Sequence, residues 1–189
     1  MLIFLSFNDT VLAERATLEG YRKKRLDRAP VTPEELEAVR SLAIRYGVID
    51  EASEAALEEP ELAELLRRVD IVPPSLALGQ AAYESGYATS RFAHTGNALF
   101  GQWTWGGEGI KPEQQRQSLG DHRIAAFEWP FDSVRGYYIN LFSHPAYEDF
   151  RRLRAELRAA GKPLDSLVLA DGLIRYSERG QDYVDGLKG

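Results

Sequence analysis

Apolar and charged positions alternate at helical spacing through the first third of the chain. Asn8 or Asp9 predicts the start of a first helix, which runs to the basic cluster at 22–25. Thr32, followed by a proline and two glutamates, predicts the start of a second helix, and Gly47 predicts its end. Two helices are therefore expected within the first 50 residues.

A third helix is expected to begin at Pro60, where leucines at helical spacing form one apolar stripe that ends at Asp70. We expect residues 1–70 to form a helical arm that packs on the remaining chain and carries no chemistry of its own. A solvated spacer is the alternative for residues 1–30.

The next helix is expected to organise the rest of the chain. Pro73 and Pro74 open it, because a proline in the first helical turn lacks only an N–H group that would be unpaired there. Small and apolar residues follow without a clean polar face, so we expect this helix to be buried on most sides. Glu84 lies near its end, immediately before Ser85 and Gly86.

We expect β structure only between residues 106 and 128. The glycines at the start of this region predict a loop or hairpin tip, because glycine readily adopts the positive φ that such turns need. Residues 122–127 are the best strand candidate, with a partner near Ile110 or within 115–119. Residues 90–96, which follow the central helix, are expected to form a short polar turn.

The last third of the chain returns to helices. The spacing of its apolar residues predicts helices at 131–142, 147–160, 164–176 and 181–187. In the second of these, Phe150 and the leucines are expected to face inward and several arginines outward. The expected fold class is therefore mainly α (α+β), with a small β excursion among helices.

The composition describes a globular protein, with 44% of its 189 residues hydrophobic and 28% charged. This length allows one domain with a helical appendage. The formal net charge of −6 argues against a nucleic-acid partner, because such proteins carry a basic footprint. The chain has no cysteine, so neither a disulfide framework nor a Cys-based metal site is expected.

The three histidines do not predict a metal site. His94, His122 and His144 are widely spaced and lack the HExxH pattern. The glycines at 106–109 lack the strand–loop–helix context of a phosphate-binding loop. We therefore expect no metal and no cofactor.

Glu84 is the main candidate for chemistry. Burying a carboxylate costs free energy unless it is hydrogen-bonded, paired or protonated, and burial raises its pKa toward the range that a general acid needs. The structural alternative is a glutamate that caps or pairs locally near a helix end.

Residues 80–90 read Gln-Ala-Ala-Tyr-Glu-Ser-Gly-Tyr-Ala-Thr-Ser around this glutamate. This segment resembles the catalytic-glutamate segment of the glucosaminidase family of peptidoglycan hydrolases (glycoside hydrolase family 73), and most closely its Bax-like subgroup. Further segments similar to that family lie, in the same order, at 96–101, 132–137, 144–147 and 176–183. Together they make a resemblance that covers about residues 70 to 189.

The resemblance implies a lysozyme-like fold in which residues 71–189 form the catalytic domain. A helical lobe would carry Glu84, and a small β-hairpin lobe would lie across a groove from it. The resemblance also implies that Glu84 is the general acid. It makes Tyr176 an active-site tyrosine whose hydroxyl positions the acetamide of the substrate or stabilises charge.

The second catalytic group is left open. Glu128 lies near the position where some family members carry a functional acid, and Glu108 and Glu113 lie in the loop and hairpin that would face the groove. The acetamide oxygen of an N-acetylglucosamine is a further alternative, because a substrate-assisted reaction needs no carboxylate nucleophile.

Aromatic residues beside a glycine-rich loop suit a sugar, since the apolar C–H face of a pyranose stacks on an aromatic ring while its hydroxyls take polar partners. The expected substrate-binding residues are Asn97, Phe100, Gln102, Trp103, Trp105, Glu108, Glu113 and Tyr183. The structural alternative places Phe100 and one tryptophan in the core, and makes Tyr176 and Tyr183 half-buried rings with satisfied hydroxyls.

The expected function is that of a peptidoglycan hydrolase, an endo-β-N-acetylglucosaminidase that cleaves after N-acetylglucosamine. The alternatives are a muramidase or lytic transglycosylase of similar fold, and a non-catalytic module that binds wall glycan. The expected partners are glycan strands of peptidoglycan, and we expect a monomer with no nucleic-acid partner.

The expected location is the cell envelope or periplasm, which the resemblance implies. Residues 1–7 are mostly apolar but too few to span a membrane, and they do not form a secretory signal peptide. We therefore expect a longer precursor, or a start upstream of Met1, to supply the export signal.

Overall fold

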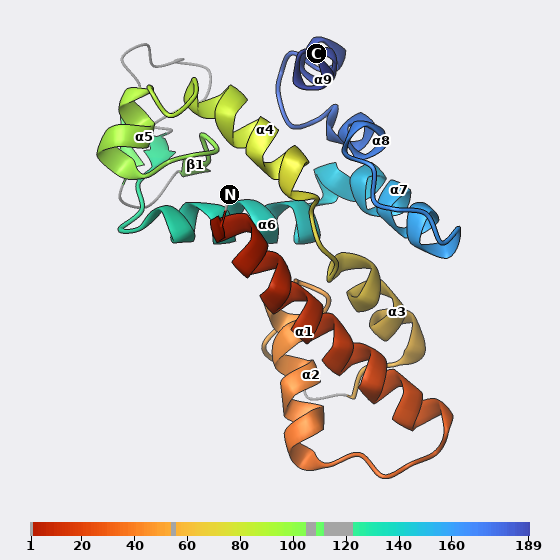
Figure 1. The fold of residues 1–189 in the computed structure, drawn as a ribbon. Helices are drawn as coiled ribbons and strands as arrows, with labels where there is room; N and C mark the ends of the chain where they lie inside the picture. The colour runs from red at the N-terminus through yellow and green to blue at the C-terminus, as the bar shows by residue number, and fades with distance from the viewer. Residues whose placement is uncertain (1, 54–55, 105–108, 112–122) are drawn as a thin grey trace.

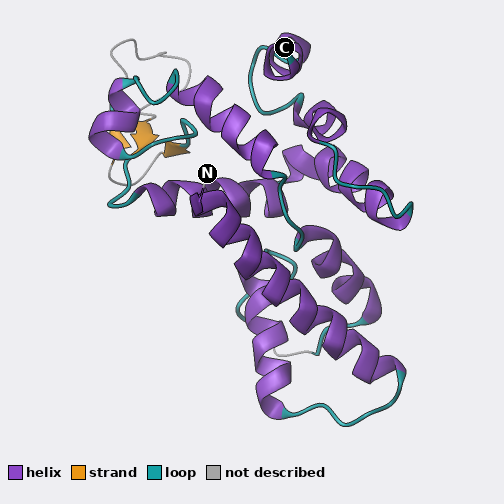
Figure 2. Ribbon diagram, viewed as in Figure 1, coloured by secondary structure: helices purple, strands orange, loops and turns teal. Residues whose placement is uncertain are grey.

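The structure, a computed structural model, describes residues 2–53, 56–104, 109–111 and 123–189. Most of them are helical, and the strands occupy one corner of the molecule (Figures 1 and 2). The helices are α1 (Leu2–Leu26), α2 (Pro33–Arg45), α3 (Glu59–Arg68), α4 (Pro74–Ser85), α5 (Arg91–Gly96), α6 (Pro130–Ser143), α7 (Glu148–Ala159), α8 (Ser166–Ala170) and α9 (Gln181–Lys188), with 3-10 turns η2 (Pro145–Tyr147) and η3 (Asp171–Leu173). The expected mainly α fold is confirmed, and it agrees with a lysozyme-like architecture.

The described strands form a small antiparallel sheet of order β1-β3-β2. β3 (Arg123–Ala125) pairs with β2 (Gly109–Ile110), as the sequence predicted for Ile110. It also pairs with β1 (Trp103–Thr104), which lies before the region expected to hold strands. The expectation was wrong there because a two-residue strand has no period to read, and its pairing is decided by the partner strand.

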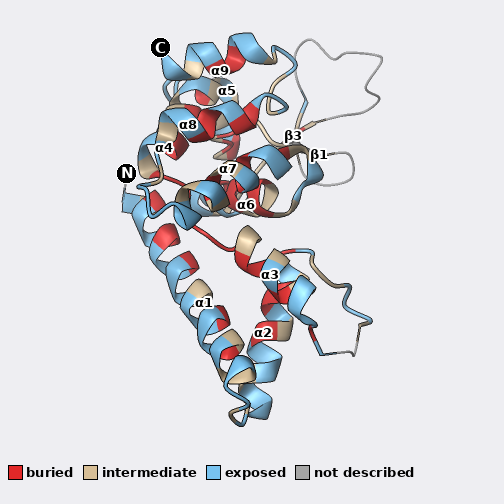
Figure 3. Ribbon diagram, turned by 90° about the vertical axis from the view of Figure 1, so that its right-hand side faces the viewer, coloured by how far each residue is buried: buried red, intermediate tan, exposed pale blue. Residues whose placement is uncertain are grey.

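The long helix α1 packs against both α2 and α3, and its first turns reach α4 and α6 (Figure 1). Its buried residues face these neighbours while the opposite side is exposed (Figure 3). The ring of Phe4 meets Phe100 edge-on at 6.2 Å between centroids, and Phe7 lies 4.5 Å from Tyr138. One continuous hydrophobic core therefore joins α1 to the helices that follow residue 70.

The first helix begins earlier than the sequence suggested. α1 starts at Leu2, so Asn8 lies inside it and does not cap it. The Asn8 amide instead donates to the carbonyl of Val72 at 2.8 Å, and its oxygen accepts from the Val72 N–H at 3.3 Å. Asn8 is buried, and both of its hydrogen bonds fix the segment that leads into α4.

The predicted starts of the next two helices are confirmed. The Thr32 hydroxyl accepts from the Glu35 N–H, and the Glu35 carboxylate accepts from the Thr32 N–H, which completes a capping box at α2. Pro60 lies in the first turn of α3, whose leucines are buried as expected.

Two expectations around α4 were wrong. The helix is buried on one face rather than on most sides, since Leu78 and Tyr83 are exposed. Residues 90–96 form helix α5 rather than a polar turn, because the Ser90 hydroxyl caps it by accepting from the Ala93 N–H and Asn97 ends it at φ 50°.

The arginines of α7 do not all face outward as expected, because Arg151 and Arg154 are both 1% exposed. Arg154 lies beneath the end of α3. Its guanidinium donates to four carbonyl oxygens between residues 67 and 71, at 2.6 to 3.3 Å. Arg151 donates to the carbonyls of Leu141 and His144. Carbonyl groups at and just beyond a helix end have no N–H partner within the helix. Here they accept hydrogen bonds from the two guanidinium groups, which makes burial of these arginines tolerable.

The helix expected at 164–176 is shorter in the structure. It divides into α8 and η3, which pack on α7. A Cβ on Gly172 would lie 2.4 Å from Phe150 Cα and 2.5 Å from Phe150 N. The two backbones approach this closely only because residue 172 is glycine.

Candidate active site

Glu84 lies in the last turn of α4, on a helix end held by an unusual turn. Gly86, Tyr87 and Ala88 are all left-handed, with φ of 58°, 57° and 63°. The Ser85 hydroxyl donates to the Ala81 carbonyl at 2.6 Å and accepts from the Ala88 N–H at 2.7 Å. Two non-glycine residues in this conformation store strain, which Ser85 and the surrounding backbone bonds hold in place.

Burial raises the pKa of the Glu84 carboxyl above its ordinary value. A hydrogen bond from Tyr183 and the positive charge of Arg179 oppose this rise without cancelling it. A Cβ on Gly101 would lie 3.8 Å from Glu84 Oε2, so the loop before β1 passes beside the carboxylate. Glu84 thus has the environment that a general acid requires.

Four tyrosines in ring contact with one another extend from Glu84 into the core: Tyr137 on α6, Tyr147 in η2, Tyr176 between η3 and α9, and Tyr183 on α9. The rings of Tyr176 and Tyr183 are stacked at 5.5 Å and 12°, and Tyr147 lies 5.8 Å from Tyr176. Burial raises the pKa of the hydroxyls of Tyr176 and Tyr183, and the negative charge of Glu84 raises it further. These hydroxyls therefore stay protonated and act as hydrogen-bond donors at physiological pH.

Gln80 connects two of these tyrosines and was missed by the sequence analysis as a site residue. Its Oε1 accepts from the Tyr137 hydroxyl at 2.7 Å, and its Nε2 donates to the Tyr183 hydroxyl at 2.9 Å. A buried amide four residues before Glu84 places both side chains on one face of α4. The four-residue spacing between Gln80 and Glu84 was the feature of the sequence that could have identified Gln80 as a site residue.

Tyr176 and Tyr183 are the two predicted tyrosines, and the structure brings both to Glu84. Tyr183 is 1% exposed, and the charge of Glu84 contributes to the raised pKa of its hydroxyl. The Tyr176 hydroxyl lies 3.5 Å from the carbonyl oxygen of Phe100. Their predicted roles toward a substrate stay predictions.

Asn97, Gln102 and Phe100, which were predicted to bind substrate, have structural contacts of their own. The Asn97 amide donates to the carbonyls of Phe127 and Glu128, both at 3.0 Å. Gln102 donates to the Ser133 carbonyl at 2.9 Å and accepts from its hydroxyl at 3.0 Å. Phe100 is 2% exposed and stacks on Tyr137 at 3.9 Å. These three residues join the segment from α5 to β1 to the start of α6.

The remaining residues that the sequence predicted for the site are either exposed or have side chains outside the described part of the chain. Glu128 is exposed, one residue before the cap of α6. Trp105, Glu108 and Glu113 lie outside the described residues, as does the side chain of Trp103, whose backbone belongs to β1. The structure therefore assembles Glu84, Tyr176 and Tyr183 among the predicted residues.

The chain matches the family described as "Glucosaminidase: Mannosyl-glycoprotein endo-beta-N-acetylglucosaminidase" over residues 59–184. The chain belongs to the glucosaminidase family. The match begins at α3 and ends in α9, so it contains Glu84 and all four tyrosines behind it. Membership of this family supports glycosidase activity.

A curated relative of this chain is "Protein bax" of Escherichia coli (strain K12). The two are 36% identical over 119 residues, which is 63% of this chain and 42% of the relative. The chain thus spans less than half of the length of that relative. No solved structure gives a significant match.

The described part of this chain contains no group of three or more His, Asp or Glu side chains able to hold a metal ion. His144 accepts from the Ala146 N–H at 3.1 Å through Nδ1, and His94 is exposed near the end of α5. His122 lies outside the described residues. Among the helices described, none is both long and apolar enough to cross a membrane.

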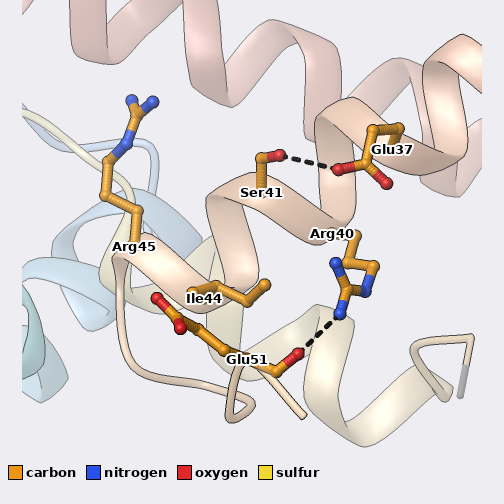
Figure 4. Close-up of a pocket in the computed structure, with 6 residues that line it drawn as sticks. All are labelled: Glu37, Arg40, Ser41, Ile44, Arg45 and Glu51. Carbon is orange, nitrogen blue, oxygen red and sulfur yellow. Dashed lines mark hydrogen bonds between the residues drawn. The ribbon is translucent and has the colours of Figure 1, made fainter. Parts of the chain in front are cut away.

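A separate hollow of about 410 Å³ lies over α2 and the loop after it (Figure 4). Its lining is mainly charged, and its polar groups are engaged: Ser41 donates to Glu37, and Arg40 donates to the Glu51 carbonyl. The lining residues all belong to the segment 37–51, so the hollow is distinct from the surroundings of Glu84.

Proposed function

We propose that this protein is a peptidoglycan hydrolase, an endo-β-N-acetylglucosaminidase with Glu84 as its general acid. The observation that carries the proposal is the buried carboxyl of Glu84 beside tyrosine hydroxyls, within a chain of the glucosaminidase family. The family description concerns cleavage of an internal N-acetylglucosamine linkage, and the wall glycan contains this sugar in every repeat.

In the proposed reaction, Glu84 is protonated when the glycan binds. It gives its proton to the glycosidic oxygen as the bond from that oxygen to C1 of N-acetylglucosamine breaks. The raised pKa of Glu84 favours its protonated form more than the pKa of an ordinary glutamate would, and the positive charge of Arg179 favours the carboxylate that forms. Positive charge then develops on the sugar ring.

The second group in the proposed reaction is the acetamide oxygen of the substrate itself. It attacks C1 from the opposite face and forms a cyclic intermediate, which water opens with Glu84 now acting as base. Tyr176 supports this route, because its protonated hydroxyl lies near Glu84 and can hold the acetamide. A carboxylate nucleophile, with Glu128 as the described candidate, is the alternative that the experiment below also examines.

We place the action of this protein in the cell envelope, where peptidoglycan lies. We propose residues 71–189 as the catalytic domain and residues 1–70 as an arm that supports it, in a monomer. The arm contributes Phe4 and Asn8 to the base of the catalytic part.

Digestion of purified peptidoglycan by the wild type and by Glu84→Gln tests this function, with mass spectrometry of the borohydride-reduced fragments. We expect fragments that end in reduced N-acetylglucosamine, and a loss of at least about a thousandfold in rate for Glu84→Gln. Glu128→Gln examines the second acid, and Glu156→Gln on the exposed face of α7 is the matched control.

Each other outcome changes the proposal in a defined way. Reduced muramic acid ends would indicate a muramidase, and anhydro ends would indicate a lytic transglycosylase. Full activity of Glu84→Gln would remove Glu84 from the reaction. Binding of glycan without fragments from the wild type would identify a non-catalytic wall module.

A further inference from the structure

The interior of α4 holds one amide, Gln80, whose side chain is fully buried. Both ends of this amide are used. The Tyr137 hydroxyl donates to its oxygen at 2.7 Å, and its nitrogen donates to the Tyr183 hydroxyl at 2.9 Å. Because a buried amide can only be accommodated with partners at both ends, the two contacts fix its orientation.

The orientation of Gln80 determines where the proton of Tyr183 points. A tyrosine hydroxyl has one proton to donate, and in Tyr183 the oxygen already receives the N–H of Gln80. The proton must therefore go to another acceptor. The carboxylate of Glu84, four residues after Gln80 on the same face of α4, interacts with this hydroxyl. Hydrogen bonds thus link Tyr137, Gln80 and Tyr183, and Glu84 interacts with the Tyr183 end of this series.

The rings that carry these hydroxyls are held firmly. Tyr183 stacks on Tyr176 and meets the ring of Tyr83 edge-on at 5.5 Å. Tyr137 stacks on Phe100 at 3.9 Å between centroids and 6° between planes. Both hydroxyls belong to rings that are 1% exposed, so neither can turn away without disturbing the core.

We propose that Gln80 is a positioning residue that aims the Tyr183 hydroxyl at the carboxylate of Glu84. The inference rests on the proposed role of Glu84 as general acid. When Glu84 gives its proton to the leaving oxygen, it becomes a carboxylate, and the hydrogen bond from Tyr183 becomes charge-assisted and stronger. The proton moves from Glu84 to the glycosidic oxygen, while the proton of Tyr183 stays on its own oxygen throughout.

Other groups also face Glu84 and must be distinguished from Tyr183. Arg179 contributes a positive charge, and the hydroxyls of Tyr147 and Tyr176 lie near enough to interact with its negative charge. Tyr183 interacts with Glu84 as a donor that opposes the rise in its pKa, and Gln80 donates a hydrogen bond to the Tyr183 hydroxyl. If Gln80 acts through Tyr183, substituting Gln80 should have no effect on catalysis once the Tyr183 hydroxyl has been removed.

A double-mutant cycle of Gln80→Met and Tyr183→Phe tests this dependence, because both changes keep the approximate shape of the side chain. Each single variant should lower kcat about tenfold with little change in KM, and should move the alkaline limb of the pH profile upward. In the Tyr183→Phe background, Gln80→Met should cause little further loss. The inference would be overturned if the loss of kcat in the double variant equalled the product of the losses in the two single variants.

A second variant and a control complete the test. Gln80→Glu supplies a carboxylate that accepts from both tyrosines, so it should turn the Tyr183 proton away from Glu84 and cause the same loss even if Gln80→Met does not fold. Tyr138→Phe is the matched control. It removes a buried hydroxyl that has no hydrogen-bond partner in the described part of the chain, and it should leave kcat unchanged.

The titration of the Glu84 side-chain carboxyl, followed by its ¹³C chemical shift, gives a readout independent of turnover. The pKa of Glu84 should rise in Tyr183→Phe and in Gln80→Glu, because each variant removes the donor from the carboxylate. An unchanged pKa in both would overturn the inference. A wild type that releases no fragments would instead refute the proposed function. The inference alone would be refuted if the wild type is active, Glu84→Gln is inactive and Gln80→Met keeps full activity.

Discussion

Arg158 and Asp70 form a bidentate ion pair, in which Nε and Nη2 of the arginine lie 2.9 and 2.8 Å from the two carboxylate oxygens. The pair joins α7 to the segment between α3 and α4. Burial by itself would raise the pKa of Asp70, but the bonds from Arg158 and the charges of Arg154 and Arg15 outweigh it and lower the pKa. The Asp70 carboxylate therefore interacts favourably with three guanidinium groups at the point where α1 and α3 meet α7.

Asp70→Asn should lower the free energy of unfolding by about 3 kcal/mol, because it leaves these arginines without their common anion. Urea unfolding at pH 7 measures the change. Asp149→Asn is the matched control, since Asp149 is an exposed partner of Arg152 and its loss should cost less than about 0.5 kcal/mol. Equal effects of the two substitutions would contradict a special role for Asp70.

The effect of Asp70→Asn should also depend on pH. A carboxyl whose pKa is lower in the folded state stabilises the fold above its unfolded-state pKa, and that contribution is lost as the pH falls through the folded-state pKa. The difference between the wild type and Asp70→Asn should therefore be constant near neutral pH and shrink below about pH 4. A difference that grows on acidification would reverse the assigned direction of the pKa shift.

Glu84→Gln should make the protein more stable at neutral pH, by roughly 0.5–1 kcal/mol, although it removes the proposed general acid. Because burial raises the pKa of Glu84, the stability of the wild type is full below the unfolded-state pKa of this group and falls as the pH rises through its folded-state pKa. The advantage of Glu84→Gln should therefore appear between pH 4 and 7. Thermal unfolding at both pH values measures it.

Ala88→Gly should stabilise the turn after Glu84 by about 0.5–1 kcal/mol, because Ala88 is left-handed with φ 63° and glycine adopts this conformation without strain. Ala82→Gly, the same substitution inside α4, should have the opposite sign and cost about 1 kcal/mol. Chemical denaturation of the two variants compares them directly. Destabilisation by Ala88→Gly would show that this strain is absent from the folded protein.

Gly172→Ala should destabilise the protein by about 2 kcal/mol, because the added Cβ would overlap the backbone of Phe150 on α7. Gly20→Ala in α1 is the control. Nothing lies within 4 Å of a Cβ there, so this change should stabilise the helix by up to about 1 kcal/mol. A neutral Gly172→Ala would mean that η3 and α7 can separate without cost.

Local signals were sufficient for much of the fold. Thr32 and Glu35 cap α2 through bonds within one turn, so four consecutive residues contain the whole determinant. Glu84 was a candidate for a similar reason, because a lone carboxylate at the end of an apolar helix must be hydrogen-bonded, paired or protonated, and its catalytic role stays a prediction. Tyr176 and Tyr183 followed from the resemblance to the family, and their position beside Glu84 became visible only in the folded chain.

The features that could not be predicted depend on partners far away in the sequence. Arg154 looks like an outward-facing helical arginine until the carbonyls at the end of α3, more than 80 residues earlier, are brought beneath it. Gln80 gains its importance from Tyr137 and Tyr183, which lie 57 and 103 residues later. Neither relationship leaves a periodic pattern that a single sequence could reveal.

The contact between Asn8 and Val72 bears on how this protein can be divided and recombined. Asn8 supplies both hydrogen-bonding groups to a backbone position just ahead of α4, and Phe4 closes the apolar surface beneath Phe100. A gene fragment limited to the family-matched segment would encode an exposed hydrophobic seam and two unpaired main-chain groups. We therefore expect residues 1–58 to be needed alongside the segment that carries Glu84 whenever the protein is divided for expression or recombined.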